Sequence, residues 1–244
     1  MTPAPRGVGW KRDDVAHDFI ERRRRVLPFL SVQEDLMVRL LRGQARAVGL
    51  FLDVGSGDGA LSELLLGAFP EARALLVDHS PPMLARAQTR LGRFADRWEA
   101  VDADLADPAW RDALAASAFD AAVSSYAIHH LDGGEKRRLF ADVLELLDPC
   151  GLFLNMDYVA VAGPLRGSFE EEMATKLVHS ERERGSKRPE AEIVAELQVA
   201  FGADDEDRPD TAEDQVAWLA GAGFADSQIH FKWGEVALLG GARP

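Results

Sequence analysis

Residues 51–59 read FLDVGSGDG, and this stretch predicts the fold of the chain. The apolar run from Val48 to Val54 is typical of a buried strand, and the run from Ala60 to Leu66 is typical of a helix. Three glycines stand between them, where the backbone can take positive φ angles and approach a ligand closely. A strand, a glycine-rich turn and a helix open a doubly wound α/β sheet, which binds ligands beyond the carboxyl ends of its strands.

Acidic residues indicate which ligand suits this turn. Asp53, Asp78 and Asp102 each close an apolar run. Parallel strands would bring the three carboxylates to one edge of the sheet, around the ligand crevice. A ligand with cationic groups, a ribose diol and an adenine amine, but without phosphate, fits this edge. S-adenosylmethionine is such a ligand.

The glycine spacing leaves an alternative open. Gly55, Gly57 and Ala60 match the G-x-G-x-x-A pattern of dinucleotide-binding proteins, although a match of this kind is a weak signal alone. Asp53 would repel a pyrophosphate, and residues 48–71 contain no Lys or Arg to offset that repulsion. A nicotinamide-dependent oxidoreductase is therefore the less favoured hypothesis.

Five segments, in order, resemble the motifs of class I S-adenosylmethionine-dependent methyltransferases. They are LDVGSGDG (52–59), VDHS (77–80), VDA (101–103), FDAAVSS (119–125) and AIHHL (127–131). The resemblance covers roughly residues 44–157, and more loosely about the last thirty. It implies a Rossmann-like, doubly wound, seven-stranded α/β sheet with an antiparallel last strand, and S-adenosyl-L-methionine as cofactor.

The same resemblance implies which residues contact the cofactor. We expect Asp78 to accept hydrogen bonds from the ribose, and Met83 to pack on the adenine. Asp102 and the amide of Ala103 would read the adenine edge, with Asp104 as a nearby alternative. The full set of expected cofactor-binding residues is Asp53, Gly55, Ser56, Gly57, Asp78, His79, Met83, Asp102, Ala103 and Ser124.

The loop after the fourth expected strand carries the catalytic candidates Tyr126, His129 and His130. Histidine suits proton transfer near neutral pH. However, family members with very different acceptors carry histidine here, which favours an architectural role, and both interpretations stay open. We expect no metal site, because adjacent histidines point in different directions and no third ligand stands at helical spacing.

The remaining segments predict the domain organisation. Residues 1–43 are expected to form helices and a lid, with Ser31 and Glu34 as a capping box. Residues 44–244 would form the methyltransferase domain, with a helical cap inserted at 158–210. Within this insertion, residues 203–207 are expected to be a solvated acidic turn. Lid and cap together predict an enclosed pocket for a small-molecule acceptor.

Composition limits the partners and the compartment. The net charge of −13 and the pI near 4.9 argue against a nucleic-acid partner. No run approaches the roughly 20 apolar residues of a membrane span. The single Cys150 excludes an internal disulfide and any multi-cysteine metal site. We expect a cytoplasmic enzyme, and the N-terminal helices are candidates for a homodimer contact.

Two further hypotheses remain. The layout is similar to bacterial relatives that make carboxy-S-adenosylmethionine for tRNA-uridine modification, but the insertion lacks a strong arginine cluster for the extra carboxylate. A non-catalytic S-adenosylmethionine-binding protein would have the same cofactor half, and would differ only on the acceptor side.

Overall fold

Seven strands form one sheet, in the order β3-β2-β1-β4-β5-β7-β6. The computed structural model describes residues 27, 29–114, 118–161, 166–195 and 207–244. The strands are β1 (Leu50–Val54), β2 (Arg73–Asp78), β3 (Trp98–Asp102), β4 (Phe119–Ser125), β5 (Leu147–Tyr158), β6 (Ala225–Trp233) and β7 (Val236–Ala242). Among the described residues, the α-helices include α3 (Leu30–Gly43), α4 (Ala60–Ala68), α5 (Pro81–Arg90), α6 (Gly133–Leu146), α7 (Arg166–Glu183) and α9 (Ala212–Ala222), and residues 190–195 are also helical. Short 3-10 helices are η2 (Leu91–Phe94), η3 (Trp110–Ala113) and η4 (Ile128–His130).

The sheet is parallel from β3 through β5, whereas β7 runs antiparallel to both β5 and β6. This confirms the predicted doubly wound, seven-stranded fold with an antiparallel end. The strand order reverses between β1 and β4, since the chain first builds outward through β2 and β3 and then returns. A reversal of this kind opens the crevice in which α/β proteins bind ligands.

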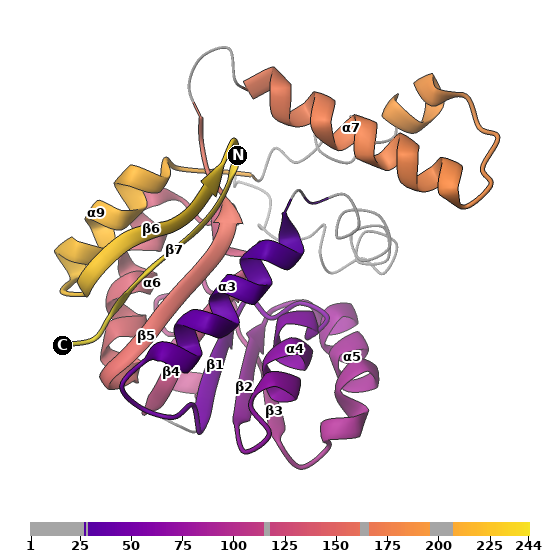
Figure 1. Cartoon of the computed structure of the whole chain (residues 1–244). Coiled ribbons are helices and arrows are strands. Elements are labelled where there is room, and N and C mark those ends of the chain that lie inside the picture. Colours follow the sequence, from indigo (N-terminus) through magenta and orange to yellow (C-terminus); the bar gives the residue numbers. More distant parts are fainter. Residues whose placement is uncertain (1–26, 28, 115–117, 162–165, 196–206) are drawn as a thin grey trace, which may run out of the picture.

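Helices cover both faces of the sheet (Figure 1). Adjacent residues of β1 pack on opposite faces of the sheet. Phe51 packs in a core cluster with residues of α3, α4 and α5, while Leu52 packs in a second cluster with residues of α6 and α9. Both side chains are fully buried. Burial on two faces explains why the central strands are continuous apolar runs.

Helix α3 belongs to the first of these layers. Its Met37 and Leu41 are buried in the cluster that also contains Phe51. The predicted capping box at its start is wrong, because the helix begins at Leu30, after Phe29 in a left-handed conformation (φ 56°), and has no side-chain cap. Most of the predicted lid, residues 1–26 and 28, lies outside the described residues.

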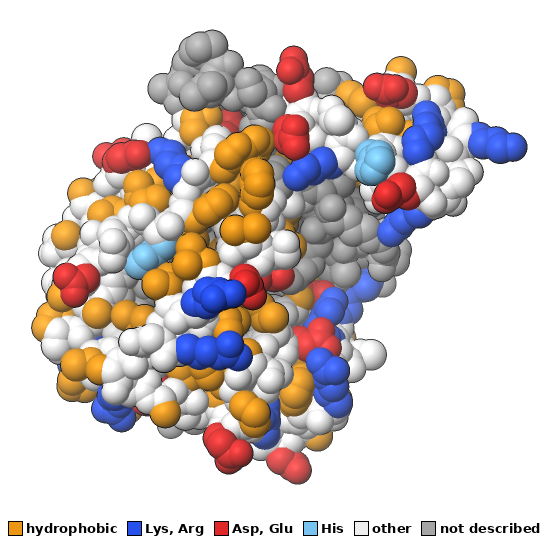
Figure 2. Space-filling view, viewed as in Figure 1, with side chains coloured by type: hydrophobic (Ala, Val, Ile, Leu, Met, Phe, Trp, Pro, Cys, Tyr) orange, Lys and Arg blue, Asp and Glu red, His pale blue; other side chains and the backbone are white. Residues whose placement is uncertain are grey.

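Helix α7 lies beyond the carboxyl ends of the strands (Figure 1). Its Met173 and Leu177 are buried in the first core cluster. Figure 2 shows hydrophobic side chains gathered on the surface over the arrowhead end of β6. In this region the ring of Phe29 packs on Trp233 at 5.3 Å. None of the helices in the described part of the chain has the length and apolar character needed to cross a membrane.

Candidate functional site

One pocket lies at the carboxyl ends of β1, β2 and β4, and it gathers most of the predicted site residues. Predicted cofactor-site residues that line it are Asp53, Gly55, Ser56, Gly57, Asp78, His79 and Met83. Two of the predicted catalytic residues, Tyr126 and His130, line the same pocket. Segments outside the core sheet contribute Leu27, Leu30 and Arg208. A cofactor and an acceptor could therefore meet in this space.

The glycine turn is held against β2 by its own backbone. The amides of Gly55 and Ser56 both donate to the carbonyl oxygen of Val77, at 2.9 and 3.0 Å. The amide of Gly57 donates to Oδ2 of Asp78 at 2.8 Å. Gly55 and Gly57 have φ angles of 69° and 53°, which side chains other than glycine rarely adopt. The turn is therefore fixed in a shape that leaves its surface open to a ligand.

One buried and one partly buried carboxylate face this turn. Asp53 is 1% exposed and accepts a hydrogen bond from Oγ of Ser62 at 2.6 Å. Burial raises the pKa of Asp53 to about 7, against the hydrogen bond from Ser62 and with a further contribution from the charge of Asp78. Burial also raises the pKa of Asp78, whose two oxygens accept the amides of Gly57 and Ser80 at 2.8 Å each. A cationic group placed beside these carboxylates would favour their ionised forms.

Three predicted cofactor residues do not line the pocket. Asp102 is exposed, and the amide of Ala103 donates to the carbonyl oxygen of Asp78 at 3.2 Å. Ser124 is fully buried, and its hydroxyl donates to the carbonyl oxygen of Val54 at 2.7 Å. Their neighbours line the pocket instead: Asp104, Leu105, Ala106 and Ser125.

Tyr126 begins the loop on the side of the pocket opposite the glycine turn. Its φ of 53° turns the chain sharply after β4, and its amide donates to the carbonyl oxygen of Met156 at 2.8 Å. The hydroxyl of Tyr126 accepts a hydrogen bond from Nε2 of Gln33 at 3.2 Å. Gln33 is fully buried on α3, so this helix fixes the tyrosine ring. Sequence reasoning did not identify Gln33, which reads as an ordinary polar residue within an amphipathic helix.

His129, the third catalytic candidate, lies behind the pocket wall and does not line it. Its Nδ1 is 2.6 Å from Oδ1 of Asp157, and its amide donates to Oδ2 of the same carboxylate at 2.9 Å. Both side chains are 2% exposed. Asp157 also accepts the amide of Tyr158 at 2.8 Å. His129 is therefore held firmly in one orientation by the end of β5.

Asp207 approaches both histidines from a distant part of the sequence. Its Oδ1 is 3.4 Å from Nε2 of His129 and 3.1 Å from Nδ1 of His130. Burial alone would lower the pKa of His129, but the Asp157 and Asp207 carboxylates raise it to about 9. Burial and the charge of His129 lower the pKa of His130. Burial would raise the pKa of Asp207, but its two histidine partners hold it below the usual range.

The predicted role of residues 203–207 as a solvated acidic turn is wrong for Asp207, whose side chain is 27% exposed and faces two imidazoles. Residues 203–206 lie outside the described part of the chain. The amide of Arg208 donates to the carbonyl oxygen of His129 at 2.8 Å. Nζ of the fully buried Lys136 donates to the carbonyl oxygen of Arg208 and pairs with Asp210 at 2.6 Å. No local pattern in the sequence could have indicated this long-range docking.

Comparison with known proteins agrees with this geometry. Residues 51–151 match the family model described as a methyltransferase domain. An uncharacterised methyltransferase of Mycobacterium tuberculosis is 35% identical over 108 residues, which cover 44% of this chain and 50% of the relative. A ribosomal RNA small subunit methyltransferase H of Corynebacterium glutamicum is 26% identical over 200 residues, covering 71% of this chain and 59% of that protein. The chain spans about half the length of the first curated relatives that it matches.

Solved structures share the fold over nearly the whole chain. An O-methyltransferase family protein from Burkholderia thailandensis has a TM-score of 0.62 at 18% identity, covering 94% of this chain and 61% of that one. Human N-acetylserotonin methyltransferase, solved in complex with S-adenosylmethionine, has a TM-score of 0.56 at 16% identity, covering 93% and 57%. Residues 51–151 therefore match a methyltransferase domain, and the chain has the fold of class I S-adenosylmethionine-dependent methyltransferases. S-adenosylmethionine is the cofactor of this class.

Proposed function

We propose that the protein transfers the methyl group of S-adenosylmethionine to a small-molecule acceptor by in-line displacement. The observation that carries this proposal is the composition of the pocket. Core-sheet residues such as Asp53 and Asp78 line one part, while Leu30 and Arg208 come from segments outside the core. A pocket built in this way suits a cofactor at the sheet edge and a small acceptor beneath the added segments.

On the cofactor side, we propose that Asp53 provides negative charge for the cationic groups of the cofactor. Asp78 is proposed to accept the ribose hydroxyls, and Met83, which is 3% exposed, to pack on the adenine. His79 and the turn residues Ser56 and Gly57 would complete this part of the site. Asp102, Ala103 and Ser124 are proposed to contact the cofactor as well, and Asp104 and Ser125, which line the pocket, are alternatives.

On the acceptor side, we propose that Tyr126 and His130 contact the acceptor, since both line the pocket. His129 would act through position alone, because its buried ring is held by Asp157. The sulfonium of the cofactor supplies the difficult chemistry, and the protein aligns the nucleophile with the methyl carbon. Alignment of this kind can contribute about 7–11 kcal/mol to lowering the barrier.

The organisation of the chain forms part of the same proposal. Residues 1–43 would serve as the lid, which the position of Leu27 and Leu30 in the pocket lining supports. Residues 44–244 would form the catalytic domain, with residues 158–210 as its cap. A cytoplasmic location and a homodimer contact through the N-terminal helices complete the proposal.

The test is turnover. The purified protein is incubated with S-adenosylmethionine and a panel of small acids, amines and phenols, and S-adenosylhomocysteine release is measured. We expect turnover with at least one class, and a large loss of it in Tyr126→Phe with cofactor affinity retained. Calorimetry with NAD(P) and with S-adenosylmethionine completes the test. Binding of NAD(P) alone would overturn the proposal.

A second candidate function is methylation of ribosomal RNA. The similarity to ribosomal RNA small subunit methyltransferase H, over 71% of this chain, is the observation that favours it. The net charge of −13 weighs against it, because RNA binding depends strongly on Lys and Arg contacts to phosphates.

A further inference from the structure

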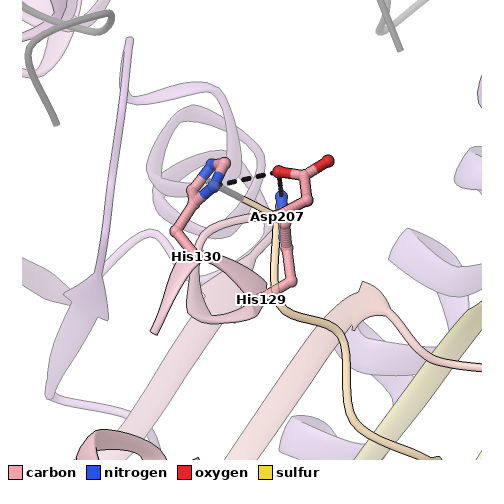
Figure 3. Close-up of side chains that lie close together, drawn as sticks. All are labelled: His129, His130 and Asp207. Carbon is pink, nitrogen blue, oxygen red and sulfur yellow. Dashed lines mark ion pairs between the residues drawn. The ribbon is translucent and has the colours of Figure 1, made fainter. Parts of the chain in front are cut away.

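Three donor atoms converge beside the acceptor side of the pocket. Figure 3 shows the imidazoles of His129 and His130 directed toward the carboxylate of Asp207, with ion pairs from both rings to this residue. One nitrogen from each ring and one carboxylate oxygen all lie within 4.8 Å of one another. Nε2 of His129 and Oδ1 of Asp207 are buried, and neither makes a hydrogen bond of normal geometry within the described part of the chain.

Two of the three spacings between these donor atoms are close to those of a small metal site. A tetrahedral ion with bonds of about 2.0–2.2 Å places its ligand atoms roughly 3.3–3.5 Å apart. The Asp207 oxygen is 3.4 Å from the His129 nitrogen and 3.1 Å from the His130 nitrogen. The two ring nitrogens lie within 4.8 Å of each other, so shifts of the imidazoles would bring all three donors around one ion. Two imidazoles and a carboxylate are ligands that suit Zn²⁺ and its neighbours among the divalent transition metals.

Neighbouring groups already hold the donor side chain of His129 in position. Histidines that bind metals usually donate their other ring nitrogen to a carboxylate or a carbonyl, which fixes the ring. Nδ1 of His129 meets Asp157 at 2.6 Å, and two backbone amides hold this carboxylate. The arrangement leaves Nε2 of His129 facing Asp207.

The segment that carries Asp207 is also fixed. The amide of the next residue, Arg208, donates to the carbonyl oxygen of His129 at 2.8 Å. Lys136 binds the same segment from α6, through the Arg208 carbonyl and Asp210. Asp207 is therefore attached to the histidine turn independently of its own side chain, as a preformed ligand set requires.

We propose that His129, His130 and Asp207 bind one divalent transition-metal ion of the zinc type. The sequence offered no third ligand at helical spacing, whereas the proposed third ligand, Asp207, comes from 77 positions further along the chain than His130. His130 also lines the pocket, so the fourth position of the ion opens toward it and would hold a water molecule or an oxygen of the acceptor. One part of this proposal, an acceptor oxygen as the fourth ligand, rests on the proposed function, and the rest does not.

The experiment uses the full-length protein, freed of metal with a chelator and without cofactor or acceptor. Zn²⁺ binding is measured by calorimetry, and Co²⁺ is used as a spectroscopic probe of the ligands. We expect about one equivalent of Zn²⁺, and a visible Co²⁺ spectrum of low coordination number. Asp207→Ala should weaken Zn²⁺ binding at least tenfold, and Asp157→Asn should weaken it by roughly 10–100-fold through the supporting shell.

His179→Ala is the matched control, because His179 also pairs with a carboxylate, Glu183 at 3.3 Å, but on the exposed surface of α7. This variant should bind Zn²⁺ as the wild type does. An unchanged Zn²⁺ affinity in Asp207→Ala, with circular dichroism showing a folded protein, would overturn the proposal, as would a wild type that binds no Zn²⁺. Since no turnover is measured, failure here is distinguishable from failure of the methyltransferase assay.

Discussion

At Gly55 the backbone has a φ of 69°, and a Cβ added there would overlap the side chain of Ala127. Gly55→Ala should therefore displace the turn or the loop that begins at Tyr126, and weaken cofactor binding at least tenfold. Calorimetry with S-adenosylhomocysteine measures the effect, and circular dichroism checks the fold. Gly67→Ala in α4 is the control, because a Cβ at Gly67 meets no atom within 4 Å. Equal dissociation constants for Gly55→Ala and the wild type would place the cofactor elsewhere.

Asp53 should make cofactor binding depend on pH. Burial raises its pKa to about 7 in the protein without cofactor, so the carboxyl is protonated below that pH and charged above it. Pairing with a cationic group requires the charged form, and binding at lower pH must first release the proton. The dissociation constant should therefore rise as the pH falls below about 7, by up to tenfold per unit, or about 1.4 kcal/mol.

Calorimetry with S-adenosylmethionine between about pH 5 and pH 7 tests this dependence. Asp53→Asn should bind more weakly at neutral pH and lose much of the slope. Asp78 also has a raised pKa, so a residual slope from Asp78 is expected. Asp35→Asn, an exposed position on α3, should keep the wild-type slope. A wild-type affinity that stays constant across this range would contradict the role of Asp53.

Site residues could be predicted from the sequence where they follow from the order of the parallel strands. Asp53 and Asp78 end neighbouring parallel strands, so their positions along the chain fix their positions at the crevice. Asp207 could not be predicted in this way. It meets His129 only because Lys136 and the His129 carbonyl hold the segment after it, and such packing has no periodic signature.

Among the elements, α6 connects the histidine turn to the sheet, and its start is capped twice. The side chain of Asp132 accepts the amides of Gly134 and Glu135, and the Glu135 side chain accepts the amide of Asp132. Asp132→Ala removes half of this capping box and should cost about 1 kcal/mol of unfolding free energy, or a few degrees in Tm. Chemical denaturation measures the cost.

Asp35→Ala on α3 serves as the control for this substitution. Asp35 makes an exposed i,i+4 ion pair with Arg39, and both side chains are at least 70% exposed. Pairs of this kind contribute about 0.3–0.5 kcal/mol. If Asp132→Ala and Asp35→Ala destabilise the protein equally, the capping box does not stabilise the turn that carries the histidines.

Helices and strands could be predicted where the spacing of apolar residues and the length of the segment indicated the same type of element. The strand from Phe119 to Ser125 is observed with the predicted bounds, and most of its residues are buried. Caps were predicted less well. The sequence pattern favoured Ser31 as a cap for α3, yet the helix begins at Leu30, where Phe29 packs on Phe231 and Trp233. Tertiary packing of one aromatic ring outweighs a local capping preference that is worth about 1 kcal/mol.

For the whole molecule, the doubly wound topology followed from the order of the motifs, because each strand and its following acidic residue had to reach the same sheet edge. Length and composition could not predict how the segments around the sheet return to that edge. Gln33 from α3 and Arg208 from beyond α7 both reach the neighbourhood of Tyr126 or His129. These contacts depend on the packing of separate layers, which no single segment encodes.

Net charge is a property of the whole chain, and it provides the test between the two candidate acceptors. With 28 Lys and Arg against 41 Asp and Glu, the protein carries −13 and should be repelled by a polyanion. We expect no retardation of a small-subunit ribosomal RNA fragment at about 0.15 M salt, where the Debye length of about 8 Å still lets nearby charges act. No methyl group should be transferred to that RNA from S-adenosylmethionine. Retardation that weakens steeply with added salt would instead reveal a local basic surface that releases counterions from phosphates, and methyl transfer to the same fragment would make RNA the acceptor.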